Sequence, residues 1–414
     1  MKKTCLLLIL ALPALAQVRR IDPPAGEGSG MPYFAQRQDG AVFLSWTEPV
    51  GAPPEPVGAQ TASPAERRHA LRVSHWNGTA WTPPETITQG ANWFVNWADF
   101  PALTVLPDGS MLAHWLARSE GGGKFGYGIK VARRGAHAAG WKQIHGMSLD
   151  EKEDYAGFLA FEPGGEMAVF LSPPPSGGGH GAHEHGGGAE HRKTVRFVRF
   201  RGDRVAAEGE IDNDACTCCP TAVGRTRSGL IAAYRDHSPG EIRDISVVRY
   251  TGGAWSKPVT LHEDGWKING CPTDGPSIAS AGSRAAIAWL TRASGEAKVQ
   301  VALSSDEGKS FTKPLRLDSG NALGRPAIAM WDESSYVAVW LEKTAGTAAE
   351  IRLRRIGGDG TLHPVQSVAT VAASRTTGFP KLAVAGNQVF LAWRDQNVRA
   401  AVLTKQEIES KEKK

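Results

Sequence analysis

The sequence predicts an all-β fold, namely a β-propeller with seven blades. The first supporting observation is a repeated two-strand pattern whose copies start roughly 50 to 70 residues apart, the spacing of propeller blades with loops. The second is the abundance of turn formers, with 48 glycines and 26 prolines among 414 residues. The third is a hydrophobic content of 41%, which is enough for a sizeable core and excludes a chain that is disordered throughout.

Each copy of the repeat reads as two short antiparallel strands around a turn, and it ends in tryptophan or another aromatic residue. The clearest turns lie at residues 107–109, 163–165 and 386–387. The copies span residues 32–46, 101–115, 155–170, 220–234, 276–289, 326–340 and 380–393. A third strand is predicted after each pair, at residues 71–75, 127–133, 195–201, 245–250, 298–304, 351–356 and 398–404.

A fourth strand can follow the third in six copies, for example at residues 255–261 and 311–317. The seventh copy lacks one because the chain continues into the charged tail 405–414. We expect residues 18–22 to fill that place and so to close a propeller domain over residues 17–404. The copy at 155–170 is the loosest, and a six-bladed ring is the alternative if it belongs to an insertion. A pair of β-sandwiches explains the period less well.

The first 16 residues have the three parts of a Sec-type signal peptide. Lys2 and Lys3 provide the charged start, residues 6–15 form an apolar run, and Ala14-Leu15-Ala16 is a cleavage signal. We therefore expect a periplasmic or secreted protein in a compartment that permits disulfides. No later stretch reaches the ~18 apolar residues of a membrane-spanning helix. The net charge of +5, without a basic cluster, argues against a nucleic-acid partner.

One segment in the fifth copy fits the Asp-box pattern Ser-x-Asp-x-Gly-x-x-aromatic. The aspartate can accept hydrogen bonds from its own turn, the glycine can take a positive φ, and the aromatic ring can pack into the blade. These structural residues are Ser304, Asp306, Gly308 and Phe311. Residues 74–81 and 250–255 are more degenerate copies. With this motif the sequence resembles the sialidase superfamily of Asp-box (BNR-repeat) β-propellers, and as architecture the resemblance covers nearly the whole chain.

The resemblance would imply exo-sialidase or related glycosidase activity on acidic sugars if the family's site residues were present. Sialidases hold the substrate carboxylate with three arginines and add a Tyr/Glu nucleophile pair and an aspartic acid/base. The place of the first arginine reads Gly30-Met31-Pro32 here, and Arg325-Pro326 lacks the spacer residue. Guanidinium groups bind carboxylates bidentately, so other arginines could rebuild an anion site. The candidates for such a site and its nucleophile are Arg235, Arg375, Arg394 and Tyr155.

The cysteines are a more unusual feature. Cys216, Cys218 and Cys219 precede blade four and Cys271 precedes blade five, so all four are predicted on one face near the channel. One interpretation is two disulfides, with Cys271 bridging the blades, because export is expected and the count is even. A second is a thiolate site for copper or zinc that His237 completes. A third is a redox thiol.

A loop rich in histidine and glycine, residues 176–191, is predicted on the same face beside the cysteine blade. A flexible tract of this kind can bind Cu(II), Ni(II) or Zn(II), because neutral imidazole is a good ligand for these ions. A solvated low-complexity loop is the alternative interpretation. The candidate ligands in the tract are His180, His183, His185 and His191.

Charged residues in loops of the same face are candidates for binding a small anionic, carbohydrate-like ligand. They are Arg235, Asp236, Arg243, Asp244, Asp274, Arg375 and Arg394. Trp93 and Trp97 are candidates for stacking on such a ligand. The Cys-x-Cys-Cys-Pro segment and the Arg/Asp motifs after it resemble a group of secreted bacterial sialidase-like propellers, which implies fold and export but no reaction.

These observations predict a binding propeller whose Cys/His/Arg-rich face takes a metal ion or an anionic ligand. An exo-sialidase or related glycosidase and a protein-interaction scaffold are the alternatives. The sequence leaves open which metal or ligand is bound, the redox state of the thiols and the oligomeric state.

Overall fold

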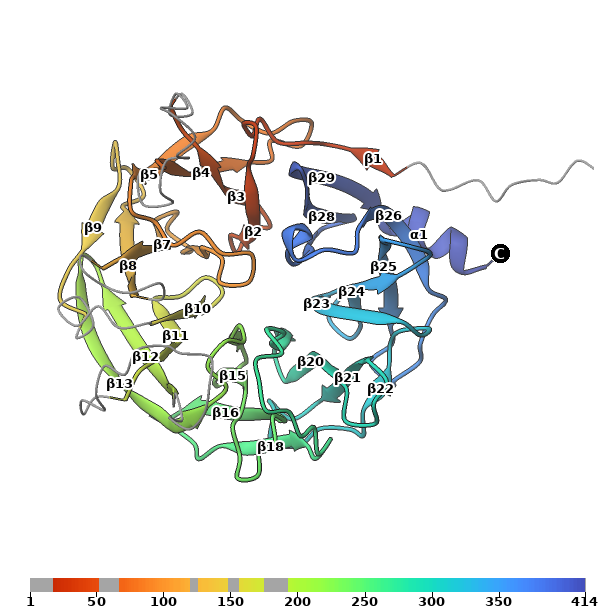
Figure 1. The fold of residues 1–414 in the computed structure, drawn as a ribbon. Helices are drawn as coiled ribbons and strands as arrows, with labels where there is room; N and C mark the ends of the chain where they lie inside the picture. Colours follow the sequence, from red (N-terminus) through yellow and green to blue (C-terminus); the bar gives the residue numbers. More distant parts are fainter. Residues whose placement is uncertain (1–17, 52–66, 120–125, 148–155, 175–192, 414) are drawn as a thin grey trace, which may run out of the picture.

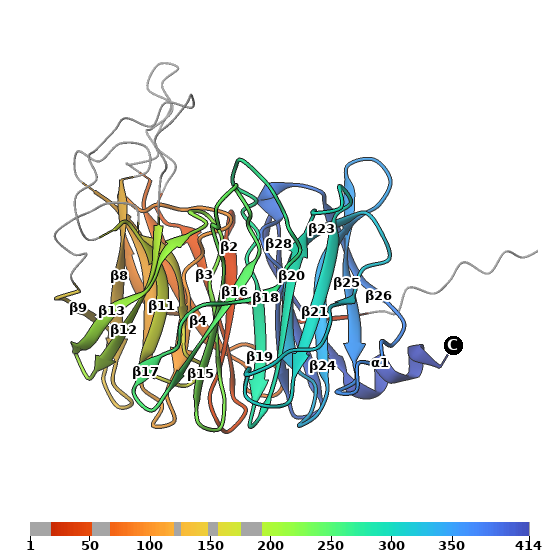
Figure 2. The ribbon, with the colours of Figure 1, turned by 90° about the horizontal axis from the view of Figure 1, so that it is seen from below.

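The computed structural model describes residues 18–51, 67–119, 126–147, 156–174 and 193–413, which form a ring of seven antiparallel sheets around a central channel (Figure 1). Seen from the side, the blades stand next to one another and their strands run between the two faces of the ring (Figure 2). The prediction of seven blades is confirmed, and the six-bladed alternative is wrong. The loosest repeat copy forms blade three, where β10 (Gly157–Phe161) pairs with β11 (Met167–Ser172).

The first strand of each blade borders the channel, and the later strands follow outward. Blade one consists of β2 (Gly30–Gln36), β3 (Val42–Pro49), β4 (His69–His75) and β5 (Glu85–Gly90). Blade two consists of β6 (Leu103–Val105), β7 (Met111–Arg118), β8 (Tyr127–Arg134) and β9 (Lys142–Ile144). Blade three continues from β11 into β12 (Lys193–Arg201) and β13 (Arg204–Ala215).

The outer edge of blade four is divided, because β16 pairs with two short segments where the sequence predicted one strand at 255–261. Its strands are β14 (Ala222–Arg225), β15 (Gly229–Arg235), β16 (Ile245–Thr251), β17 (Ala254–Trp255) and β18 (Val259–His262). Blade five consists of β19 (Ser277–Ala281), β20 (Arg284–Thr291), β21 (Lys298–Ser304) and β22 (Leu315–Arg316). Blade six consists of β23 (Ala322–Met330), β24 (Tyr336–Lys343), β25 (Ala348–Ile356) and β26 (Gln366–Ala372).

Blade seven closes the ring with a strand from the other end of the chain. Its own strands are β27 (Lys381–Ala385), β28 (Gln388–Asp395) and β29 (Asn397–Thr404). The fourth strand is β1 (Arg19–Arg20), which pairs with Val402 and Ala401 of β29. The expectation that residues 18–22 complete the last blade is therefore confirmed. A short 3₁₀ helix, η1 (Arg375–Thr377), precedes β27.

Tryptophans of the second strands fill the blades, and the four most deeply buried are Trp46, Trp289, Trp340 and Trp393. The indole N–H of Trp46 donates to Glu48 over 2.7 Å, and that of Trp340 donates to Glu342 over 2.9 Å. These bonds satisfy polar groups that burial would otherwise leave without a partner. An apolar cluster lies between each pair of neighbouring blades, so the core is itself a ring.

The segment that fits the Asp-box pattern is a turn between β21 and β22. Asp306 accepts hydrogen bonds from the Ser304 hydroxyl over 2.8 Å and from the Ser310 amide over 3.0 Å. Burial opposes ionisation of Asp306, but bonds from these serines outweigh it and lower its pKa to about 2. Gly308 has φ +74°, and a Cβ there would lie 2.7 Å from Ile231 of blade four. Phe311 packs into the same interblade cluster, so the contacts of this turn are structural.

The charged tail contains a helix, α1 (Lys405–Glu412), that packs against the outside of the ring (Figure 1). A capping box between Thr404 and Glu407 starts the helix, and Ile408 is buried against blades six and seven. Among the described residues, no helix is long and apolar enough to cross a membrane. The predicted signal peptide, Tyr155 and the histidines of 176–191 lie outside the described residues.

Candidate functional site

Two loops bring all four predicted thiols together between blades four and five. The first loop, residues 216–221, connects β13 to β14, and the second, residues 263–276, connects β18 to β19. The Thr217 hydroxyl lies 3.5 Å from Cys271 Sγ, and the Thr273 hydroxyl lies 3.9 Å from Cys218 Sγ, so each loop reaches across to a thiol of the other. The predicted convergence of the cysteines is therefore present.

The core of this region is a cluster of three buried thiols, Cys216, Cys218 and Cys219. Their Sγ atoms all lie within 4.8 Å of one another, and Cys216 Sγ is 3.6 Å from Cys219 Sγ. Their residues are 1%, 7% and 1% exposed. The four described cysteines are free thiols, since no pair lies at disulfide distance. Three converging sulfur atoms form a donor set suited to a soft metal ion.

Close backbone packing holds the two loops in register. A Cβ on Gly275 would lie 2.0 Å from the carbonyl oxygen of Pro220, so only glycine lets the second loop approach the first this closely. Thr221 anchors the first loop to blade three by donating to the Phe158 carbonyl over 2.7 Å. The Cys216 amide donates to the Arg235 carbonyl over 3.0 Å, which ties the start of the loop to the end of β15.

Arg235 is a buried residue that connects several segments of this region through hydrogen bonds. Its side chain is almost completely inaccessible. The guanidinium donates to the Asp274 carbonyl over 3.0 and 2.9 Å, to the Arg243 carbonyl over 2.6 Å and to the Leu290 carbonyl over 2.8 Å. It also lies over the Trp266 ring, 4.7 Å from its centroid. Arg235 was predicted as an anion ligand, but four of its five N–H donors bond to backbone carbonyls, so it links the loops of this region.

The environment of the thiols favours one thiolate. Hydrogen bonds from Cys218 and Cys219, aided by the charges of Arg235 and Arg243, lower the pKa of Cys216 well below its usual range despite burial. Donating to Cys216 raises the pKa of Cys218, and burial raises that of Cys219. The metal-binding form of cysteine is the thiolate. Among the three buried thiols, ionisation is therefore most favoured at Cys216, and a bound cation would favour loss of the other protons.

Cys271 differs from the other three cysteines because its side chain is exposed. Residues 269 and 270 before it are exposed too, whereas 274–276 at the base of the loop are buried. A hydrogen bond from Cys218 lowers the pKa of Cys271 to about 7. Cys271 is not among the three cysteines whose sulfur atoms are mutually close. It lies at the rim of the cluster, on the side of Cys218.

His237 was predicted as a further metal ligand, but its ring is held by carboxylates. Its Nδ1 lies 2.8 Å from Asp214 Oδ1, and its Nε2 lies 3.4 Å from Glu241 Oε1. It does not join the group of mutually close ligand atoms formed by Cys216, Cys218 and Cys219. The structure therefore places His237 in a neighbouring polar network and not in the thiol cluster.

The other predicted anion ligands of blade four are also engaged in local contacts. Asp236 accepts from the hydroxyls of Ser238 and Ser246 over 3.1 and 3.2 Å, and burial raises its pKa. Asp244 accepts from the Gly265 and Trp266 amides over 2.9 and 3.0 Å, which fixes the start of the second cysteine loop. The guanidinium of Arg243 donates to Glu241 over 2.5 Å.

Asp274 is a buried acid between two arginines. Its Oδ2 accepts from the Arg325 amide over 2.7 Å, while its Oδ1 is buried with no hydrogen-bond partner. Burial raises its pKa to about 7, although the charges of Arg235 and Arg325 act in the opposite direction. Arg325 in turn donates to the carbonyls of Ser374 and Gly378 and stacks on Trp97, 4.6 Å from the ring centroid.

A second region lies on the same face at blades seven, one and two. It is a cavity of about 340 Å³ whose described lining includes Arg67, His69, Arg394 and Lys381 but no carboxylate. Trp97 contributes an aromatic wall to this cavity. Arg394 lies against Gly30, where an added Cβ would be 3.1 Å from Arg394 Cδ. Arg375, another predicted ligand, is exposed in η1 and is not part of the lining.

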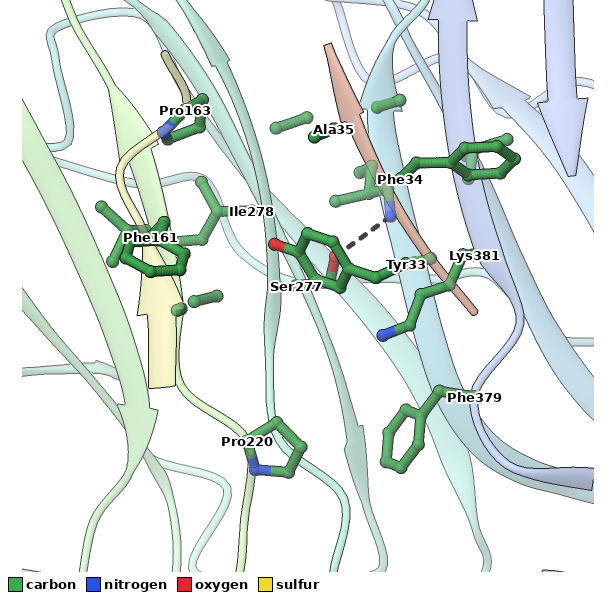
Figure 3. Close-up of a pocket in the computed structure, with 18 of the residues that line it drawn as sticks. Tyr33, Phe34, Ala35, Phe161, Pro163, Pro220, Ser277, Ile278, Phe379 and Lys381 are labelled. Carbon is green, nitrogen blue, oxygen red and sulfur yellow. Dashed lines mark hydrogen bonds between the residues drawn. The ribbon is translucent and has the colours of Figure 1, made fainter. Parts of the chain in front are cut away.

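Lys381 lies where this cavity meets the central channel, and it lines both. Figure 3 shows its amine pointing into the channel between Tyr33 and Phe379. The amine lies 3.2 Å from the centroid of the Phe100 ring. Neither Lys381 nor Arg394 forms a hydrogen bond or ion pair with a described residue. Burial lowers the pKa of Lys381 well below its usual range, so an anion in the cavity would favour the charged amine.

Sequence reasoning missed Lys381, because nothing in the pattern separates this residue from an ordinary first residue of a blade. It also paired Trp93 with Trp97 as a stacking candidate. Trp93 is buried in the core beside Trp115 at 6.2 Å, and only Trp97 lines the cavity. The channel itself has a volume of about 360 Å³ and includes Asp99, whose pKa burial raises to about 7.

Comparisons with known proteins identify the architecture. No family model matches the sequence, and no curated protein matches it. A protein of unknown function from Dyadobacter fermentans is similar in structure, with a TM-score of 0.52 and 14% identity over 95% of this chain and 100% of that one. An ulvan lyase of polysaccharide lyase family PL25 has a TM-score of 0.52 and 12% identity, over 95% of this chain and 99% of that one. The NanB sialidase of Streptococcus pneumoniae has a TM-score of 0.45 and 10% identity, over 94% of this chain and 70% of that one. At these identities, the two structures with a TM-score of 0.52 share the fold with this chain.

Proposed function

We propose that the protein binds a soft metal ion through Cys216, Cys218 and Cys219, and that copper(I) is the preferred ion. The observation that carries this proposal is the convergence of three buried sulfur atoms within 4.8 Å. The arginines and the buried backbone contacts around the thiols position them before any ion arrives. Buried free thiols in an exported protein would otherwise be exposed to oxidation, and a bound metal gives a reason to keep them reduced.

The donor set distinguishes copper(I) from zinc. Soft thiolates bind both ions, but structural zinc sites are almost always four-coordinate and tetrahedral. The described cluster offers three mutually close ligand atoms, and His237 is held by carboxylates. A site of three sulfur atoms fits copper(I) without a further ligand, whereas zinc would need a fourth. We therefore expect the site to bind copper(I) more tightly than zinc, and the affinities for these two ions are the ones to compare.

Anaerobic titration of the reduced full-length protein with Cu(I), in competition with a chromogenic chelator, tests the proposal. We expect one ion per chain, and we expect Cys216→Ser to weaken binding at least about 100-fold, because it removes a ligand and not merely an outer-shell partner. Asn213→Ser is the matched control, since Asn213 is exposed just before the cysteine loop. Unchanged affinity in Cys216→Ser would refute the site. If the intact mass of the native protein is lower by the thiol hydrogens that are lost when two disulfides form, the disulfide interpretation of the cysteines is favoured instead.

A second proposed function is binding of an anionic, carbohydrate-like ligand in the cavity of Arg394 and Lys381. Its support is a set of cationic side chains without a carboxylate among the described lining residues, together with Trp97 as a stacking surface. Calorimetry with glucuronate, and with glucose as the neutral control, tests it. We expect glucuronate binding to fall about tenfold or more in Lys381→Met and Arg394→Gln, and to persist in Arg375→Gln. Equal binding of glucose and glucuronate would refute an anion site.

An exo-sialidase or related glycosidase and a protein-interaction scaffold remain the alternatives to these binding functions. Turnover of a sialoside that is lost in Arg394→Gln would favour the enzyme, and a stoichiometric partner recovered from the same compartment would favour the scaffold. We also propose export to the periplasm or beyond, on the pattern of residues 1–16. A mature protein beginning at Gln17 would support it.

A further inference from the structure

The four thiols are not equally accessible to solvent. Cys216 and Cys219 are each 1% exposed, Cys218 is 7% exposed, and Cys271 is exposed at the surface. The loop that carries Cys271 also contacts Cys218, the most accessible of the three buried thiols, because the Thr273 hydroxyl lies 3.9 Å from Cys218 Sγ. The three buried thiols are thus enclosed by the protein, and Cys271 is the thiol nearest to them that solvent can reach.

The two cysteine loops are also held differently. The inner loop, with the three buried thiols, is fixed by the Thr221 bond to blade three and by the Cys216 amide. In the outer loop the base is fixed, since Gly275 packs on Pro220 and Asp274 accepts from Arg325. The tip at 269–271 is exposed beyond that fixed base. Cys271 thus sits next to a fixed donor set but on a surface that another molecule can reach.

We propose that Cys271 is an exchange ligand, through which the soft metal ion passes between the buried thiols and a thiol-bearing partner. This inference rests on the proposed metal-binding function. In the step, a metal–sulfur bond to Cys271 forms as the bond to Cys218 breaks. A thiolate of the partner then bonds to the metal as the bonds to Cys216 and Cys219 break, and a second soft donor of the partner bonds to it as the bond to Cys271 breaks. The protons that the partner's thiols release are taken up by the freed thiolates of this protein. The metal keeps its oxidation state, so no electron donor or acceptor is required.

The partner is identified by its chemistry as a soft donor, either a small thiol or an exposed cysteine of another protein. A carboxylate partner would be a poor acceptor, because copper(I) prefers sulfur to oxygen ligands. Thr217 places its hydroxyl 3.5 Å from Cys271 Sγ and so orients the thiol beside the cluster.

Stopped-flow transfer from the Cu(I)-loaded protein to glutathione and to a strong Cu(I) chelator tests the proposal. In Cys271→Ser we expect the stoichiometry to stay at one ion and the affinity to change by less than about threefold, while transfer to glutathione slows about tenfold or more. Asn269→Ser, on the same exposed tip, is the matched control and should transfer at the native rate. The glutathione and chelator arms distinguish a path that needs a small thiol from general access to the ion.

Two results would overturn the exchange role while leaving the metal site in place. Loss of most of the Cu(I) affinity in Cys271→Ser would make Cys271 a resident ligand, and an unchanged transfer rate would leave it without a part in exchange. A native protein that binds no Cu(I) when fully reduced would overturn the proposed function and the exchange role together. The affinity and the rate are read in the same samples, so these failures are distinguishable.

Discussion

The thiol region at blades four and five and the cavity at blades seven, one and two share a face but use positive charge in opposite ways. In the thiol region, the Arg235 guanidinium directs four of its five N–H donors to three backbone carbonyls. In the cavity, Lys381 and Arg394 form no hydrogen bond or ion pair with the described residues. The difference teaches that an arginine near a propeller channel is a ligand candidate only when its own protein leaves it unsatisfied.

The sharpest way to break this comparison is to remove Arg235. We expect Arg235→Met to lower the free energy of unfolding by about 3–5 kcal/mol, because it leaves several buried carbonyls without a donor. The thiol cluster should be lost along with it. Urea unfolding measures the stability, and Arg394→Met is the matched control, expected to stay within about 0.5 kcal/mol. A stability loss as small as that of the control would contradict the structural role of Arg235.

The pH dependence of stability sharpens the comparison on the side of Asp274. Burial raises its pKa to about 7, whereas an unfolded aspartate titrates near 4, so the folded state holds the proton more tightly between these values. The stabilisation is fully present below pH ~4 and is lost as pH rises through ~7, with an upper limit of about 4 kcal/mol. Unfolding measured from pH 5 to 8 should show a falling stability that is shallower in Asp274→Asn. An equal slope in the variant would contradict the raised pKa.

The close approach of the two cysteine loops predicts a smaller effect at Gly275. We expect Gly275→Ala to cost about 1–3 kcal/mol and to weaken Cu(I) binding, because its Cβ would lie 2.0 Å from the Pro220 carbonyl oxygen. Gly270→Ala is the control in the same loop, since the nearest atom to its Cβ would be 4.0 Å away. Thermal unfolding and Cu(I) competition give the two readings. Similar behaviour of the two variants would show that the loops do not need this contact.

The smallest expected effect on stability is at Lys381. Lys381 is half-buried, and its amine forms no hydrogen bond or ion pair with a described residue. Replacing it with methionine should leave the free energy of unfolding unchanged or raise it by up to about 1 kcal/mol. The same substitution should remove anion binding. Chemical unfolding of Lys381→Met beside the native protein checks the prediction. A decrease in the free energy of unfolding of more than about 1 kcal/mol would mean that Lys381 stabilises the fold, which would contradict its assignment as a ligand-binding residue.

Much of the fold followed from residue pattern, and the errors were local. The repeat fixed the seven blades and even the pairing of residues 18–22 with the last one, because strand alternation and turn residues act over short distances. The divided edge of blade four and the helix at Lys405–Glu412 did not follow. The helix depends on the burial of Ile408 against blades six and seven. In blade four, Trp255 packs on Phe197 of blade three, whereas Leu261 packs on the cluster between blades four and five.

The sequence by itself determined that four cysteines meet on one face, since consecutive blades place equivalent loops at the same end of the ring. Only the tertiary structure decided which of them form the buried cluster, because the distances among Cys216, Cys218 and Cys219 depend on how two loops pack around Gly275 and Arg235. The same holds for charge. Composition does not distinguish the roles of cationic residues. Arg235 donates to backbone carbonyls, whereas Lys381 faces a cavity, and this difference depends on contacts between residues far apart in the chain.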